Sequence, residues 1–162
     1  PMLVEAGCHY VELAHSERLQ HFGENYPAVR LKVDKALANG LTPIICLGET
    51  AQEKAAGRAD AVLAEQVLTS LAGQPDSRVP ETILAYEPRW AIGGADAASP
   101  DYVAERHRVL REILREHRGE AAAQQRRWRS SDASCARTRG CSASRSASSR
   151  CPRVRASPCA MR

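Results

Sequence analysis

Two mainly apolar segments of this chain each end in a side chain that can take part in proton transfer. His15 follows residues 11–14, and Glu87 follows residues 82–86. A histidine and a carboxylate together can carry out general acid–base chemistry, because one donates a proton or hydrogen bond while the other accepts. The two residues are far apart in the sequence, so only the fold can bring them together.

The surroundings of His15 allow two interpretations. His15 precedes Ser16 and Glu17, which could begin a helical turn. A helix N-terminus favours a neutral imidazole, which is suited to donating a hydrogen bond to a carbonyl group. Taken alone, a histidine in this position is more often a structural residue than a catalytic one.

The loop after Glu87 favours a functional role for that carboxylate. Most carboxylates are solvated or paired, but here Pro88, Trp90, Gly93 and Gly94 provide a stiff entry, an apolar cover and a flexible exit. Such a loop is typical of a lid that excludes water and strengthens the charge interactions beneath it.

The elements that position these residues alternate between strand and helix. Strands are predicted over residues 11–14, 43–47 and 82–86, of which the second is a continuous apolar run typical of a parallel sheet. Helices are predicted over residues 27–38, over residues 50–71 with a capping box at the start and a break at Gly57, and from Ser99 as N-cap with Pro100 in the first turn. This order predicts an α/β fold with parallel strands, either a doubly wound sheet or a piece of a β/α barrel.

The composition divides the chain into two parts. Residues 1–118 have 13 Lys and Arg against 17 Asp and Glu, a net charge of −4, whereas residues 119–162 have a net charge of +8 and are rich in Arg, Ser and Cys. The second part shows almost no apolar periodicity and cannot bury enough surface to offset its chain entropy. We therefore expect an ordered domain at 1–118 and a disordered tail at 119–162.

The cysteines favour a reduced compartment. Cys8 and Cys46 lie in apolar runs and are interpreted as small buried hydrophobic residues. Four more cysteines stand in the tail without a C-x-x-C pair, so the spacing of zinc ligands is absent. No signal peptide or membrane-spanning run is recognised, and a cytoplasmic protein is expected.

Several motifs, in order and at matching separations, resemble the triosephosphate isomerase family over residues 1–118. The matching stretches are Gly7-Cys8, His15-Ser16-Glu17-Arg18, Phe22-Gly23-Glu24, Gly40-Leu41-Thr42-Pro43, Cys46-Leu47-Gly48-Glu49, Ala85-Tyr86-Glu87-Pro88 and Trp90-Ala91-Ile92-Gly93. The resemblance implies a partial (β/α)8 barrel covering about the fourth to sixth βα units.

The resemblance also implies roles for individual residues. His15 would be the neutral electrophile that polarises the substrate carbonyl, and Glu87 the base that moves a proton between adjacent carbons, the known division of labour in this family. Glu17 would be the carboxylate beside the electrophile, the alternative being an ion pair with Arg18. Gly93 would donate its backbone N–H to the substrate phosphate, with no cofactor or metal involved.

The chain departs from the family pattern at three places. Gly94-Ala95-Asp96 stands where Thr-Gly-Lys is usual, Arg89 where valine is usual, and Ala14 where glycine is usual. These changes would also fit a paralogue that acts on a slightly longer sugar, such as a tetrulose phosphate. Segments corresponding to the first three and last two βα units, which hold most of the phosphate contacts, have no counterpart.

Two functions of different classes follow. The first is a triose-phosphate isomerase that interconverts dihydroxyacetone phosphate and glyceraldehyde 3-phosphate through an enediol(ate), in a family that is commonly homodimeric. The second is an inactive fragment, or a partner that needs complementing pieces of barrel. Neither hypothesis involves a nucleic acid or a membrane.

The tail has two explanations. An out-of-frame translation of a GC-rich gene yields Arg, Ala, Ser, Pro and Cys, and a start at Pro1 fits an incomplete gene. A disordered basic arm that binds nucleic acid is the alternative, with Trp128 as its sole stacking residue. Reading the other two frames of the DNA beyond Arg118 distinguishes them, because the first explanation requires a strand followed by a Tyr-Gly-Gly-Ser-like turn.

Overall fold

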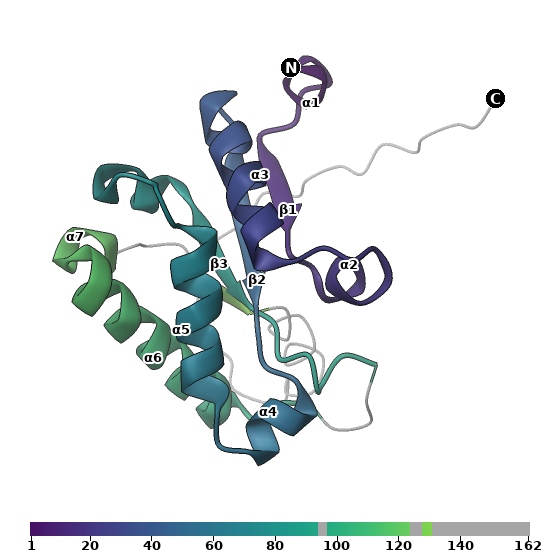
Figure 1. Cartoon of the computed structure of the whole chain (residues 1–162), viewed down its shortest axis with the longest axis vertical. Helices are drawn as coiled ribbons and strands as arrows, with labels where there is room; N and C mark the ends of the chain where they lie inside the picture. The colour runs from purple at the N-terminus through teal and green to yellow at the C-terminus, as the bar shows by residue number, and fades with distance from the viewer. Residues whose placement is uncertain (94–96, 124–127, 131–162) are drawn as a thin grey trace, which may run out of the picture.

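The computed structural model describes residues 1–93, 97–123 and 128–130 as a parallel sheet with helices packed against it (Figure 1). The sheet has four strands in the order β1-β2-β3-β4, and each strand pairs in parallel with the next. The strands are β1 (Tyr10–Leu13), β2 (Thr42–Leu47), β3 (Ile83–Tyr86) and β4 (Trp128–Ser130).

The connections between the strands are mostly helical. The helices are α1 (Met2–Glu5), α2 (Ser16–His21), α3 (Tyr26–Ala38), α4 (Ala51–Ala55), α5 (Ala59–Ser70), α6 (Pro100–Arg118) and α7 (Glu120–Ala123), with a 3-10 turn η1 (Asp76–Glu81) before β3. Parallel strands require such crossovers, because the chain must return to the opposite end of the sheet before it can enter the next strand in the same direction.

The polar residues predicted to begin helices do so. Thr50 and Glu53 form a reciprocal capping box at α4, and the side chain of Ser99 accepts a hydrogen bond from the backbone of Tyr102 at α6. Gly57 separates α4 from α5 with a φ of +66°, a left-handed conformation that an L side chain rarely adopts. The predicted interruption of the second helical region is thereby confirmed.

The long helices lie on one face of the sheet. Helix α3 contacts β1, β2 and α5, and α5 contacts β2 and α6, so α3, α5 and α6 stand side by side (Figure 1). A doubly wound sheet places helices on both faces and reverses its strand order. The four described strands follow one another in order with the long helices on one face, which agrees with a piece of a β/α barrel.

The core lies between these helices and the sheet. The residues buried to less than 2% exposure include Val29, Val33, Ile45, Leu47, Leu63, Val67, Leu71, Leu84, Tyr86, Leu110 and Leu114. They come from α3, α5 and α6 at helical spacing and from β2 and β3. Truncating one such leucine to alanine typically costs about 2–5 kcal/mol, so this layer holds the strand ends in position.

Two short described elements lie beyond Arg118, the last residue of the predicted domain. Helix α7 (Glu120–Ala123) follows Gly119 and buries Ala122 and Ala123, and β4 pairs with β3 in the register Leu84↔Trp128. A four-residue helix and a three-residue strand are too short to show a periodic pattern. The other residues of the predicted disordered tail, 124–127 and 131–162, lie outside the described residues.

Two further predictions concern the cysteines and membrane-spanning helices. Cys46 is buried as predicted, but Cys8, which lies between α1 and β1, is partly exposed. Among the described residues, no helix combines the length and apolar character required to cross a membrane.

Candidate active site

Three ionisable residues follow the carboxyl ends of three neighbouring strands. His15 stands two residues after β1, Glu49 two residues after β2, and Glu87 directly after β3. The strands are parallel and in register, with Leu13 opposite Ile45 and Leu47 opposite Tyr86. Their carboxyl ends therefore meet at one edge, where ligands bind in parallel α/β folds.

The structure brings the two predicted proton-transfer residues into contact. The Nε2 atom of His15 lies 3.2 Å from Oε1 of Glu87. The second carboxylate oxygen of Glu87 accepts a hydrogen bond of 3.3 Å from the backbone N–H of Ser16, in the first turn of α2. The side chain of Glu87 is 10% exposed and that of His15 33%, so the pair is partly shielded yet open on the imidazole side.

The backbone of Glu87 is held against the end of β2. Its N–H donates a hydrogen bond of 2.7 Å to the carbonyl of Leu47. A Cβ atom added to Gly48 would lie only 1.9 Å from the carbonyl oxygen of Glu87. A glycine is therefore required at position 48 for the two chain segments to approach this closely.

A buried carboxylate supports the turn that carries His15. Ala14 has a φ of +59°, and its N–H donates a hydrogen bond of 3.1 Å to Oε2 of Glu24. Glu24 also pairs with Lys32 and with Arg18. The left-handed backbone at position 14 explains why glycine is usual there, and the Glu24 contact offsets part of the strain that alanine introduces.

The charges around Glu24 decide its protonation state. Burial is the largest influence and opposes ionisation, but the hydrogen bond and charge of Lys32, the Ala14 N–H and the charge of Arg18 together outweigh it. The pKa of Glu24 is consequently lowered, and the ionised carboxylate accepts the hydrogen bond from the Ala14 N–H.

The third strand-end residue, Glu49, is fully buried and surrounded by aromatic donors. Its carboxylate accepts hydrogen bonds from the hydroxyl groups of Tyr86 (3.0 Å) and Tyr102 (2.8 Å) and from Nε1 of Trp90 (2.8 Å). Its backbone carbonyl accepts the N–H of Arg89. Glu49 thus ties the segment after Glu87 to the end of β2 and to α6.

The tyrosines of this cluster are strongly held in their neutral form. Burial, followed by the negative charge of Glu49, raises the pKa of Tyr86 well above its usual range. Burial and the hydrogen bond to Glu49 raise the pKa of Tyr102 to about 12. Both hydroxyl groups therefore remain donors to Glu49 across the neutral pH range.

The other two predicted site residues are not brought into contact with the pair. Glu17 is exposed in the first turn of α2 and, in the described part of the chain, forms no ion pair with Arg18, which binds Glu24 instead. Gly93 is exposed with a φ of +69° and has open space around its Cα. The predicted lid residue Gly94 and its neighbours to 96 lie outside the described residues.

Cys46 is inside the sheet and its thiol is poorly suited to reaction. It is buried at 3% exposure, and its Sγ donates a hydrogen bond of 3.4 Å to Oε1 of Glu12. Burial and the nearby negative charges of Glu87 and Glu12 raise the pKa of the thiol well above its usual range. These contacts support the packing interpretation of Cys46.

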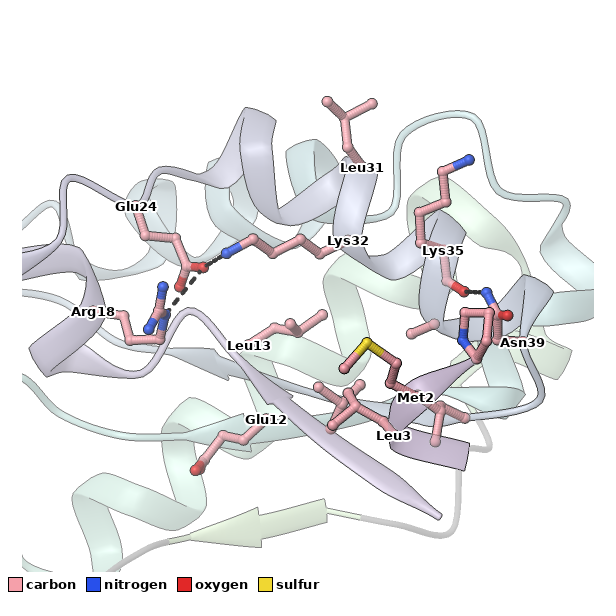
Figure 2. Close-up of a pocket in the computed structure, with 14 residues that line it drawn as sticks. Met2, Leu3, Glu12, Leu13, Arg18, Glu24, Leu31, Lys32, Lys35 and Asn39 are labelled. Carbon is pink, nitrogen blue, oxygen red and sulfur yellow. Dashed lines mark hydrogen bonds and ion pairs between the residues drawn. The ribbon is translucent and has the colours of Figure 1, made fainter. Parts of the chain in front are cut away.

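A cavity of about 700 Å³ lies away from the His15–Glu87 pair. It is formed between α1, β1 and α3, with Met2, Leu3 and Leu31 among its apolar walls and the Glu24–Lys32 pair at one end (Figure 2). Neither His15 nor Glu87 lines it. In the described part of the chain, no three His, Cys, Asp or Glu side chains are grouped so that they could hold a metal ion.

Sequence reasoning missed several residues that build the site. Glu24, Gly48 and Glu49 stand in the quoted motifs but were assigned no role, and Lys54 was not singled out. A carboxylate just beyond an apolar strand is a usable signal: Glu49 stands two residues after β2, and Glu87 stands directly after β3. Nothing in the sequence marked Lys54.

Comparison with known proteins identifies what this chain is similar to. The family model for triosephosphate isomerase matches residues 1–127. Two similar proteins named triosephosphate isomerase come from Chloroflexus aurantiacus, 43% identical over 116 residues, and Symbiobacterium thermophilum, 47% identical over 122 residues. A protein of Rhizobium etli named L-erythrulose-1-phosphate isomerase is 50% identical over 117 residues.

The matches cover most of this chain but less of each relative. They include 72%, 75% and 70% of this chain, and 46%, 48% and 43% of the Chloroflexus, Symbiobacterium and Rhizobium proteins respectively. The chain therefore spans about half the length of the curated relatives it matches.

Proposed function

This chain belongs to the triosephosphate isomerase family, and from that membership we propose that it serves the aldose–ketose isomerisation of a small phosphorylated sugar. The preferred reaction is the interconversion of dihydroxyacetone phosphate and glyceraldehyde 3-phosphate. The observation that carries the proposal is the 3.2 Å contact between Nε2 of His15 and Oε1 of Glu87 at the carboxyl ends of β1 and β3.

The proposed chemistry uses the two side chains in sequence. The Glu87 carboxylate removes a proton from the carbon next to the substrate carbonyl, while His15 donates a hydrogen bond to the carbonyl oxygen as negative charge develops there. In the resulting enediol(ate), the proton of the neighbouring hydroxyl group passes to the former carbonyl oxygen through the His15 imidazole, and the former carbonyl carbon accepts a proton from the Glu87 carboxyl group. The proton is returned, so the reaction needs no redox partner.

The surroundings of the pair support these roles. The Ser16 N–H, 3.3 Å from Oε2 of Glu87, leaves Oε1 as the oxygen that faces the imidazole. A substrate would replace the direct His15–Glu87 contact, with its carbonyl oxygen on the imidazole and its acidic carbon on the carboxylate. The Gly93 N–H, exposed beyond this site, is proposed as a donor to the phosphate.

The larger architecture is part of the same proposal. We take the four consecutive parallel strands, with their long helices on one face, to correspond to a section of the (β/α)8 barrel of the family. The phosphate contacts of a whole barrel come from several different strand ends. A chain with only some of them binds substrate weakly, which is why an inactive polypeptide is the alternative outcome.

A second substrate has a specific observation in its favour. The Rhizobium etli relative at 50% identity is named for L-erythrulose 1-phosphate, a sugar with one more carbon. Arg89 stands two residues after Glu87, where it departs from the usual valine.

A coupled isomerase assay of the purified full chain tests the proposal with both sugars. We expect turnover of dihydroxyacetone phosphate above background, and a loss of about 10²–10⁴-fold in kcat/KM for Glu87→Gln and for His15→Gln, the range typical of a lost general acid or base. Glu116→Gln, an exposed carboxylate on α6, is the matched control and should retain full activity.

The outcomes separate the alternatives. A higher kcat/KM with L-erythrulose 1-phosphate than with the triose favours the second substrate. Absence of turnover with either sugar, in a chain shown to be folded, supports the non-catalytic alternative.

A further inference from the structure

Lys54, on α4, lies against two aromatic rings of the strand-end cluster. Its Nζ atom is 3.2 Å from the ring centre of Trp90 and 4.8 Å from that of Tyr102. We propose that Lys54 is a positioning residue that holds Trp90, and through it the segment carrying Glu87. The consequence for catalysis rests on the proposed function, whereas the contact itself can be tested independently of it.

Glu49 is the buried carboxylate of this cluster. This carboxylate is 0% exposed and none of the ion pairs among the described residues includes it. Its partners are three neutral donors, on Tyr86, Trp90 and Tyr102. A buried charge is costly unless it is balanced, so a nearby cation is needed to complete the arrangement.

A cation over these aromatic rings acts on Glu49 through their hydrogen-bond donors. An ammonium group over an aromatic face is attracted by the ring quadrupole. It also withdraws electron density from the ring, so that the indole N–H and phenol O–H become stronger donors to Glu49. Lys54 therefore stabilises the Glu49 carboxylate through the rings of Trp90 and Tyr102, without touching it.

Lys54 differs from Arg106, another cation near these rings. Arg106 also lies over the Tyr102 ring, at 5.1 Å, but its guanidinium forms an ion pair with Asp60. Lys54 has no ion pair with a carboxylate in the part of the chain that the structure describes. An exposed lysine ordinarily extends into water, so its position over Trp90 indicates that the ring holds it.

Trp90 is linked to Glu87 along the chain. Trp90 is three residues after Glu87, and the intervening Arg89 N–H donates to the Glu49 carbonyl at 3.1 Å. The segment is thus anchored at Glu87, Arg89 and Trp90 in succession. Releasing Trp90 frees one end of this segment, and the direction of the Glu87 carboxylate toward His15 becomes less well defined.

The experiment compares Lys54→Met, which removes the charge at similar length, with Lys54→Arg, which keeps a cation. Lys35→Met, on the exposed surface of α3, is the matched control. The chain has two tryptophans, so a Trp128→Phe background makes Trp90 the single fluorophore. Acrylamide quenching then measures the exposure of Trp90 directly, and circular dichroism checks that every variant is folded.

We expect the quenching constant of Trp90 to rise at least about twofold in Lys54→Met and to stay unchanged in Lys54→Arg and Lys35→Met, because only the first removes the cation from the ring. In the isomerase assay, kcat should fall about five- to tenfold in Lys54→Met with little change in KM, and recover in Lys54→Arg.

The quenching measurement decides whether Lys54 holds Trp90. Unchanged quenching in Lys54→Met, or quenching in Lys54→Arg as large as in Lys54→Met, overturns the proposal. A wild-type chain without turnover contradicts the proposed function instead, and the quenching result still decides whether Lys54 holds Trp90.

Discussion

Replacing Gly48 with alanine should displace Glu87 from the end of β2. The added Cβ would meet the Glu87 carbonyl oxygen at 1.9 Å, whereas a carbon and a carbonyl oxygen in contact are about 3.3 Å apart, so one segment must move by about 1.4 Å. The three atoms nearest to the added Cβ are backbone atoms of Glu87 and Pro88, which cannot rotate away as a side chain would.

The cost of this movement can be estimated from the bonds it disturbs. The Glu87 N–H donates to the Leu47 carbonyl at 2.7 Å, and a shift of this size breaks that bond. Leaving a buried donor unsatisfied costs about 1–3 kcal/mol and overpacking a further 1–3 kcal/mol, so Gly48→Ala should lose about 2–6 kcal/mol of unfolding free energy. A misplacement of about 1 Å can reduce catalysis about 10²-fold.

Urea unfolding followed by circular dichroism measures the first effect, and the isomerase assay measures the second. Gly57→Ala is the matched control, since Gly57 has a φ of +66° and nothing within 4 Å of an added Cβ. It should lose only the backbone strain of a left-handed alanine, about 1 kcal/mol. Equal unfolding free energies for the two variants would refute the close approach of Gly48 to Glu87.

Three further predictions concern ionisable groups. The pKa of Glu24 is lowered in the folded chain, so its ionised form stabilises the protein above the ordinary pKa of 4.5, and this stabilisation is lost as the pH falls further. Glu24→Gln should lower the free energy of unfolding by about 1–3 kcal/mol at pH 7 and flatten the acid side of a plot of urea midpoint against pH. An unchanged acid side contradicts this prediction. The pKa of Tyr102 is raised to about 12, so the neutral phenol stabilises the protein fully below the ordinary tyrosine pKa of about 10, and this stabilisation is lost as the pH rises toward 12. Tyr102→Phe should remove this alkaline loss of stability in the same assay. A loss that persists in the variant would show that another group causes it. Burial raises the pKa of Cys46, so iodoacetamide followed by peptide mass mapping should find Cys8 modified at least about tenfold faster, and similar rates would show that Cys46 is accessible.

Much of the local structure could be predicted from the sequence. The three predicted strands, the helix at residues 26–38 and the start of the helix at Pro100 lie within one or two residues of the expected positions, because apolar periodicity and capping residues act over a few positions. The one-residue shift at the start of α3 has a local cause, since the side chain of Asn25 caps the helix by accepting the Ala28 N–H.

Other parts of the fold could not be predicted in this way. The short elements α7 and β4 carry no periodic pattern of their own, and β4 exists through its pairing with β3. Whether the sheet was doubly wound or wound in one direction was also open. The sequential order of the described strands favours the second, and that order depends on packing between helices far apart in the sequence.

The sequence by itself determined the family and the identities of the two residues that can exchange a proton, because motifs such as those around His15 and Glu87 are local. Only the tertiary structure decided that these side chains lie 3.2 Å apart, and that Gly48, Glu24 and the aromatic donors of Glu49 hold them there. The physical reason is that hydrogen bonding, charge balance and close approach depend on distances between segments. Spacing along the chain does not encode those distances, whereas the parallel register of β1, β2 and β3 does.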